Sequence, residues 1–147
     1  MKSSVNMKSA SHRSRRSAVR VGAVAVEFAI VAPITFMLFF AAYEFSRANM
    51  VRHSLDIAAY EGARAGITPG ATVDDVEQRV TRILKGVGVR GATIEVSPDP
   101  IGRTTPAITV EVDVAMGPNS WTQSEFFRAL NMHASATLAR EGFTSND

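Results

Sequence analysis

The chain changes from basic to apolar within Arg16-Ser17-Ala18-Val19-Arg20-Val21-Gly22-Ala23-Val24-Ala25-Val26-Glu27-Phe28. Apolar residues then continue to Tyr43. A helix over Val21–Tyr43 rises about 34 Å, against roughly 30 Å of bilayer hydrocarbon, so the sequence predicts a membrane-spanning helix. The ionisable group of this segment is Glu27. A carboxylate within a membrane is costly and is therefore commonly functional.

The charge of the chain is distributed unevenly along its length. The formal net charge is only +2 at pH 7, yet the charged residues before Val21 are all basic. Lys and Arg on one side of a spanning helix favour the cytoplasm for that side. We therefore expect a basic cytoplasmic leader over residues 1–22, a transmembrane helix over 23–43 and an extracytoplasmic domain over 44–147. The basic residues of the leader are Lys2, Lys8, Arg13, Arg15, Arg16 and Arg20.

Composition excludes several classes of function. A basic arm can bind nucleic acid, but this one abuts a spanning segment and lacks interleaved aromatics, so we expect no nucleic-acid partner. The chain has no cysteine, which excludes disulfides, thiolate metal sites and a cysteine nucleophile. His12, His53 and His133 lack the spacing of a metal site, and no nucleophile elbow surrounds any serine. We expect neither enzymatic activity nor a cofactor or metal.

The apolar run has two further features. A secretory signal has a shorter apolar core followed by a small-x-small cleavage site, so a signal peptide is the weaker interpretation. Pro33 falls inside the run. Neighbours and local adjustments compensate for proline in a membrane helix, so we expect a kink rather than a break.

The helix is predicted to continue in an amphipathic form over residues 44–66, until Thr68-Pro69-Gly70 ends it. A second helix is predicted to begin with Thr72 as its cap and acids in its first turn, and to end near Gly86. The apolar face of the first helix steps by threes and fours, which is one side of a helix. Its members are Ala48, Val51, Leu55, Ala58, Ala59 and Gly62.

Strand patterns follow the second helix. Residues 92–97 form a short strand-like run, and residues 107–116 alternate. Turn residues 98–102 lie between them, which predicts a hairpin. Residues 132–140 also alternate and predict a third strand, after a short helical turn over 124–130. The fold class is therefore α+β: a long N-terminal helix, a shorter helix and a small antiparallel sheet of about three strands. The water-exposed half of the long helix is expected to cover the apolar face of the sheet.

Two local patterns have plain structural interpretations. Gly86-Val87-Gly88-Val89-Arg90-Gly91 is superficially similar to a dinucleotide-binding loop, but it follows a helix rather than a strand, so we expect an ordinary loop. Trp121, with Phe126 and Phe127, is expected in the core under the last loop.

Gly22 and Glu27 together have a functional interpretation. Glycine leaves the backbone accessible, so a membrane protease could cut after Gly22 and free the amine of Ala23. Glu27 would lie roughly 6 Å deeper. In a bundle of subunits it could pair with the amine of a neighbour, since an unpaired charge there is expensive. Equally, Glu27 could snorkel toward cytoplasmic water and Gly22 could be incidental.

Three stretches in order carry a resemblance to a known family. Gly22-Ala23-Val24-Ala25-Val26-Glu27-Phe28 resembles the type IV prepilin processing site. Tyr43-Glu44-Phe45-Ser46-Arg47 and Ala58-Ala59-Tyr60-Glu61-Gly62-Ala63-Arg64 are similar to two later motifs of TadE-like pseudopilins of the tight-adherence (Flp) pilus system. Ser46 replaces the usual glycine and Tyr60 the usual arginine. The resemblance covers about Gly22–Gly66.

The resemblance implies a pilin-like plan, cleavage between Gly22 and Ala23 by a prepilin peptidase, and a role of Glu27 in assembly within the membrane. It implies retention in the bacterial inner membrane as a single-pass minor pilin. The implied partners are the peptidase, other pilins or pseudopilins, the Tad assembly platform and membrane lipid. Further family motif positions are Phe28, Pro33, Glu44, Phe45, Arg47, Glu61, Gly62, Ala63 and Arg64.

Alternatives remain at this stage. Glu61 and Arg64 are three residues apart on a predicted helix, so they could pair on its surface or dock onto a neighbouring subunit. The chain could also be an uncleaved, membrane-anchored binding module that faces the periplasm, or a secreted soluble domain.

Overall fold

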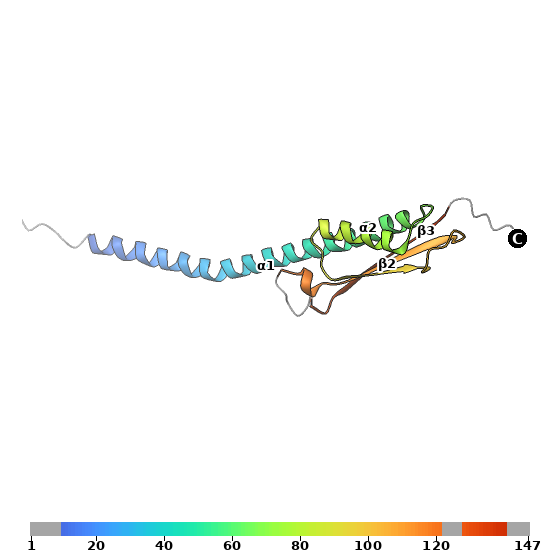
Figure 1. Cartoon of the computed structure of the whole chain (residues 1–147). Helices are drawn as coiled ribbons and strands as arrows, with labels where there is room; N and C mark the ends of the chain where they lie inside the picture. Colours follow the sequence, from blue (N-terminus) through green and yellow to red (C-terminus); the bar gives the residue numbers. More distant parts are fainter. Residues whose placement is uncertain (1–9, 122–127, 141–147) are drawn as a thin grey trace, which may run out of the picture. The chain divides into compact units, whose positions relative to one another are not determined.

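The structure, a computed structural model, describes the backbone of residues 10–121 and 128–140 and the side chains of residues 22–121 and 128–140. The chain divides into two compact units, Met1–Tyr43 and Glu44–Asp147. Figure 1 shows helices followed by a sheet, and the predicted α+β class is confirmed. The elements are helix α1 (Ala10–Gly66), helix α2 (Val73–Gly86), strands β1 (Ala92–Ser97) and β2 (Ala107–Ala115), the 3-10 turn η1 (Gly117–Asn119), and strand β3 (Asn131–Ala139).

Helix α1 is longer than predicted. It begins at Ala10, inside the basic leader, rather than at Val21, and the Ala and Arg residues of this segment are good helix formers. The helix passes through Pro33 without a break, as expected. Near the proline, the Thr35 hydroxyl donates a hydrogen bond of 2.9 Å to the carbonyl of Val31. Local side-chain bonding of this kind accompanies proline in membrane helices.

The second unit is a three-stranded antiparallel sheet, ordered β1-β2-β3, with helices on one face. The predicted hairpin and third strand are confirmed, with β3 one residue earlier than expected. Val112 of the central strand pairs with Ile94 on one side and Ala134 on the other. This register puts the apolar alternation of all three strands on the same face. The buried residues of β2 are Ile108, Val110, Val112 and Val114.

The second half of α1 packs against both α2 and the sheet, which lie beside it in Figure 1. Its predicted apolar face is buried throughout, from Ala48 to Gly62, and Ala63 is buried beside it. The closest approach is at Gly62. A Cβ there would lie 2.6 Å from Cγ2 of Val80 in α2 and 3.4 Å from Cγ1 of Val110 in β2. Only a residue without a side chain fits between the two layers.

Helix α2 begins with a capping box. The Asp75 backbone N–H donates to the Thr72 hydroxyl at 3.3 Å, and the Thr72 backbone N–H donates to the Asp75 carboxylate at 3.0 Å. Hydrogen bonds from the Thr72 side chain and backbone hold the pKa of Asp75 below its usual value. The predicted cap at Thr72 is therefore confirmed, and its strength depends on the charge of Asp75.

Replacing Gly62 with alanine is expected to destabilise the second unit by about 1–3 kcal/mol, because the new methyl group overpacks the junction with Val80. The matched control is Gly86→Ala. A Cβ at Gly86 would meet no atom within 4 Å, so this variant should be neutral or slightly more stable. Urea unfolding of the detergent-solubilised full chain, followed by circular dichroism, measures both. Equal stability of the two variants would contradict the tight junction.

The capping box makes stability depend on pH. Because the pKa of Asp75 is lowered in the folded chain, its charged form stabilises the fold above the ordinary carboxyl range. That contribution is lost as pH falls through the lowered pKa. Asp75→Asn should therefore lower the melting temperature at neutral pH, and the difference from wild type should shrink as the solution is acidified. Asp74→Asn, in the same first turn, is the control. A difference independent of pH would contradict this role of Asp75.

Candidate functional site in helix α1

The first candidate feature is the apolar half of α1. Its large apolar side chains are exposed: Phe28 to 70% and Phe39 to 66%. Contiguous apolar surface of this extent is not stable against water and marks an interaction with a membrane or with protein. The helix from Gly22 onward is long and apolar enough to cross a bilayer, with none of its most apolar window buried. These observations indicate a membrane-anchored protein.

The predicted processing residues lie at the start of this surface. Gly22, Ala23 and Glu27 all lie within α1. Among the residues whose side chains the structure describes, none comes within 4 Å of a Cβ built at Gly22. Ala23 and Glu27 are four residues apart and therefore share one face of the helix. Glu27 is exposed on that face, and both cleavage and its role in assembly stay predictions.

The second motif, Glu44 to Arg47, begins the second unit, and its residues have different environments. Glu44 is 2% exposed, whereas Phe45 is 71% exposed. Arg47 is half-buried and bonds to three backbone carbonyls. Its Nε donates to Asn119 at 3.3 Å, and its two terminal nitrogens donate to Val87 at 3.4 Å and Gly88 at 3.2 Å. Arg47 therefore ties α1 to the end of α2 and to η1.

Asn119 completes this connection, and it was not singled out from the sequence. Its side chain accepts the backbone N–H of Arg90 at 2.8 Å and donates to the carbonyls of Arg90 and Ala115, both at 2.9 Å. The side chain is buried, and both its amide oxygen and its amide nitrogen have hydrogen-bond partners. The one signal in the sequence was an asparagine directly after Gly117-Pro118, which is typical of a turn.

The third motif, Glu61 to Arg64, divides into packing and surface residues. Gly62 and Ala63 lie in the core, while Glu61 contacts Arg64 at 3.7 Å and Arg79 at 2.8 Å. The predicted Glu61–Arg64 pair is therefore present, but Arg79 of α2 is the closer partner. The hydrogen bond from Arg79 is the main cause of the lowered pKa of Glu61. The Glu61–Arg64 pair lies at the surface, with the Arg64 side chain 67% exposed, so it contributes little to stability.

The loop after β2 differs from the prediction. Trp121 was expected in the core, but it is 67% exposed, because the buried positions of this loop are taken by Asn119 and Ser120. Phe126 and Phe127, and most of the predicted turn over 124–130, lie outside the described residues. The glycine-rich segment after α2 is a loop, as expected.

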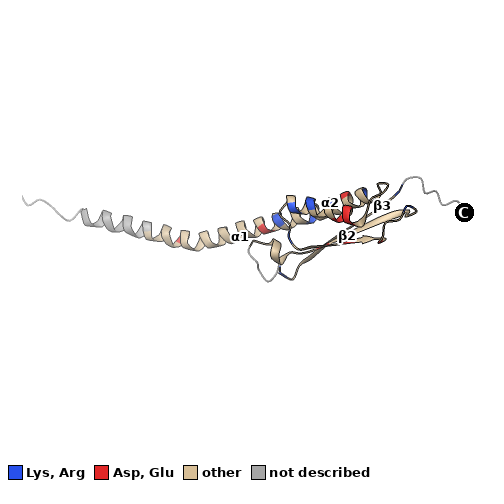
Figure 2. Cartoon of the chain, viewed as in Figure 1, with Lys and Arg blue, Asp and Glu red and all other residues tan. Residues whose placement is uncertain are grey.

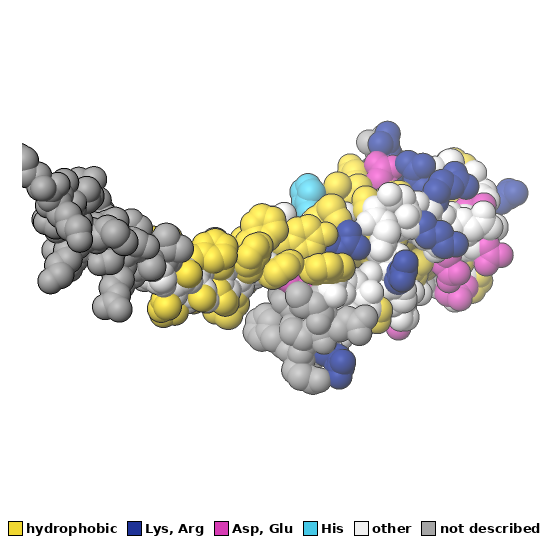
Figure 3. All heavy atoms as spheres, turned by 90° about the vertical axis from the view of Figure 1, so that its left-hand side faces the viewer, with side chains coloured by type: hydrophobic (Ala, Val, Ile, Leu, Met, Phe, Trp, Pro, Cys, Tyr) yellow, Lys and Arg dark blue, Asp and Glu magenta, His cyan; other side chains and the backbone are white. Residues whose placement is uncertain are grey.

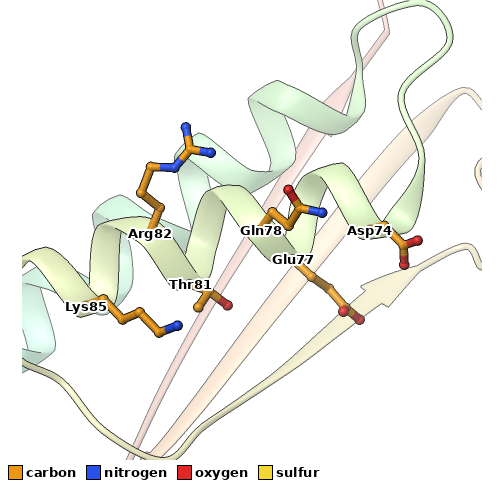
Figure 4. A pocket seen from close by; sticks show the side chains of 6 residues that line it. All are labelled: Asp74, Glu77, Gln78, Thr81, Arg82 and Lys85. Atoms are coloured by element: carbon orange, nitrogen blue, oxygen red, sulfur yellow. The ribbon is translucent and has the colours of Figure 1, made fainter.

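An open hollow on α2 is lined by charged and polar side chains, and Figure 4 shows several of them pointing outward from the helix. This is the solvated face of an amphipathic helix. Within the described residues, no group of three His, Asp or Glu side chains is placed to hold a metal. The lining residues are Asp74, Glu77, Gln78, Thr81, Arg82 and Lys85.

A family model described as TadE-like protein matches residues 22–64. This segment is TadE-like. The match begins at Gly22 and ends at Arg64, so it contains the predicted processing site, the apolar run and both later motifs. The resemblance predicted from these motifs is confirmed, while α2 and the sheet lie outside the TadE-like segment. No significant match was found among curated proteins or solved structures.

Replacing Arg47 with alanine is expected to destabilise the second unit by about 1.5–3 kcal/mol, because carbonyls that accept from a charged donor lose it. Arg52→Ala is the matched control, since Arg52 is exposed on the same helix. Thermal unfolding in detergent compares the two. A loss at Arg52 as large as that at Arg47 would contradict a specific role for the three carbonyl contacts.

Proposed function

We propose that this protein is a non-enzymatic minor pilin or pseudopilin that acts in the assembly of Flp-type pili for adherence or secretion. The observation that carries the proposal is the TadE-like match over the helix that contains Gly22, Glu27 and the exposed apolar surface. A structural role is consistent with the rest of the described chain, where charged side chains pair on the surface or hold loops together.

The proposed location is the bacterial inner membrane, which α1 crosses once. The six basic residues before Val21, with no acid among them, support a cytoplasmic N-terminus. Residues 44–147 would then fold outside the cytoplasm. The absence of cysteine means that this domain would be held by packing and hydrogen bonds rather than disulfides.

In this proposal a prepilin peptidase cuts between Gly22 and Ala23. The open surroundings of Gly22 support access to the backbone. Once cut, the new amine of Ala23 would carry a positive charge near the membrane boundary. Glu27 supplies the opposite charge, and a carboxylate buried among packed helices must find such a partner. A contact between the amine of one subunit and Glu27 of another would fix their register during assembly with other pilins and the Tad assembly platform.

The test is to express the full chain with and without a prepilin peptidase and to determine its N-terminal mass. Cleavage should give a product that begins at Ala23. Gly22→Leu should block it, whereas Ala25→Leu, which adds the same bulk three residues later, should still be cut. An intact leader in the wild-type chain would favour an uncleaved, membrane-anchored binding module.

Glu27→Ala should separate cleavage from assembly. The variant keeps Gly22 and should be processed normally, but it lacks the carboxylate proposed to pair with a neighbouring amine. We expect a loss of co-purification with partner pilins after crosslinking in membranes, and partial rescue by Glu27→Asp. Normal co-purification of the Glu27→Ala protein would contradict the pairing.

A further inference from the structure

The end of the second unit at which α1 enters has a distinct surface, here called the entry end. It consists of residues 44–49 of α1, 85–91 after α2, 116–121 around η1, and 128–130 before β3. Arg47 and Asn119 hold the first three segments together through their hydrogen bonds. The Met116 N–H donates to the carbonyl of Leu130 at 2.9 Å and brings in the fourth.

Exposed cations gather at the entry end. Lys85, Arg90 and Arg128 are all exposed. The described residues of this end contain one carboxylate, Glu44, and it is buried to 2% exposure. Figure 2 shows Lys and Arg on the helices nearer this end, and Asp and Glu on the part of α2 farther from it. The entry end therefore presents positive charge without an exposed negative group among the described residues.

Two exposed aromatic side chains lie at the same end. Phe45 is 71% exposed and Trp121 is 67% exposed. Phe45 also lines an open, mostly apolar hollow with Ala48 and Leu130. Figure 3 shows hydrophobic side chains on the surface of α1 and basic side chains on the surface of the second unit. Aromatic side chains beside cations are the composition found at the boundary between lipid and water.

Chain connectivity places this end next to the membrane. The apolar run ends at Tyr43, and the next residue, Glu44, belongs to the entry end. If α1 spans the bilayer, the first turn of the second unit emerges at the level of the lipid headgroups.

We propose that the entry end docks on the membrane surface and recognises anionic phospholipid, with Lys85 and Arg90 contacting headgroups and Phe45 and Trp121 entering the interface. The inference rests on the membrane anchoring proposed above and adds a second, electrostatic contact to it. A cation near an anionic membrane surface changes the docked-to-undocked ratio about fivefold. Screening by salt weakens this attraction.

The experiment uses Trp121, which is the one tryptophan of the chain. The full chain is reconstituted in phosphatidylcholine vesicles with or without phosphatidylglycerol, and Trp121 fluorescence is quenched by lipids spin-labelled near the headgroup. We expect stronger quenching with phosphatidylglycerol and a return toward the phosphatidylcholine value in high salt. Lys85→Gln/Arg90→Gln should reduce docking by about fivefold for each cation removed.

The matched control is Arg79→Gln/Arg103→Gln. It removes the same charge from exposed sites outside the entry end, so it should quench like the wild type. Equal effects of the two double variants, or quenching independent of phosphatidylglycerol, would overturn the proposal. If Trp121 fluorescence changes with the ratio of protein to lipid and not with the phosphatidylglycerol content, the entry end would instead bind a second copy of the chain, and the proposal would be overturned.

Carbonate washing of the same vesicles distinguishes lipid docking of the entry end from membrane anchoring by α1. Release of the protein would overturn the anchoring itself, and the lipid docking with it. Retention of the protein without lipid-dependent quenching would overturn the docking alone and leave the membrane-spanning helix in place.

Discussion

The fold of the second unit depends on how closely α1 approaches its neighbours at Gly62. At this position the helix meets α2 through Val80 and the central strand through Val110. The approach is closer than at Gly66, where the helix meets Val76 and Ile108. A side chain at residue 62 would push apart the layers that cover the apolar face of a sheet of only three strands. Such a sheet is not stable unless a helix covers it. Glycine at residue 62 therefore permits a compact core built mainly from valine, alanine and a few larger side chains.

Arg47 fixes the same helix near the start of the part that belongs to the second unit, which begins at Glu44. It bonds to carbonyls at the carboxyl end of α2, where the helix dipole is negative and unpaired carbonyls need donors. A third bond reaches Asn119, whose own side chain holds the backbone of Arg90. The TadE-like segment thus supplies both fixed points of the domain, Arg47 and Gly62, although α2 and the sheet lie outside it.

Periodicity predicted the elements well because each has one apolar face. The strands and the buried face of α1 could be derived from spacing, and the Thr72 cap from the residue types at the start of α2. The start of α1 was missed because residues 10–20 have no apolar face to give a periodic signal, although their arginines and alanines favour a helix. Trp121 was misplaced for another reason. Size and hydrophobicity favour burial, but Asn119 makes bonds that hold the loop in a conformation that leaves Trp121 exposed.

Long-range polar contacts could not be predicted at all. Arg47 and Asn119 are 72 residues apart, and Glu61 and Arg79 are 18 apart. Neither separation produces a periodic signal. Arg47 could therefore be noted from the sequence only through the resemblance to TadE-like pseudopilins. The proposed processing site is the opposite case. Gly22 and Glu27 could be singled out from the sequence because the roles proposed for them depend on local order along one helix.

The contacts of Arg47 also bear on the proposed orientation. An arginine just beyond the spanning segment, on the side proposed to face away from the cytoplasm, works against the bias set by the basic leader. Arg47 is half-buried and donates hydrogen bonds to carbonyls at the end of α2. Its guanidinium group is therefore less exposed to the surroundings once the domain has folded. Lys85, Arg90 and Arg128, by contrast, stay exposed on the same side of the span as Arg47. The proposed orientation therefore depends on the six basic residues of the leader, with no acid among them, and not on a lack of cations beyond the span.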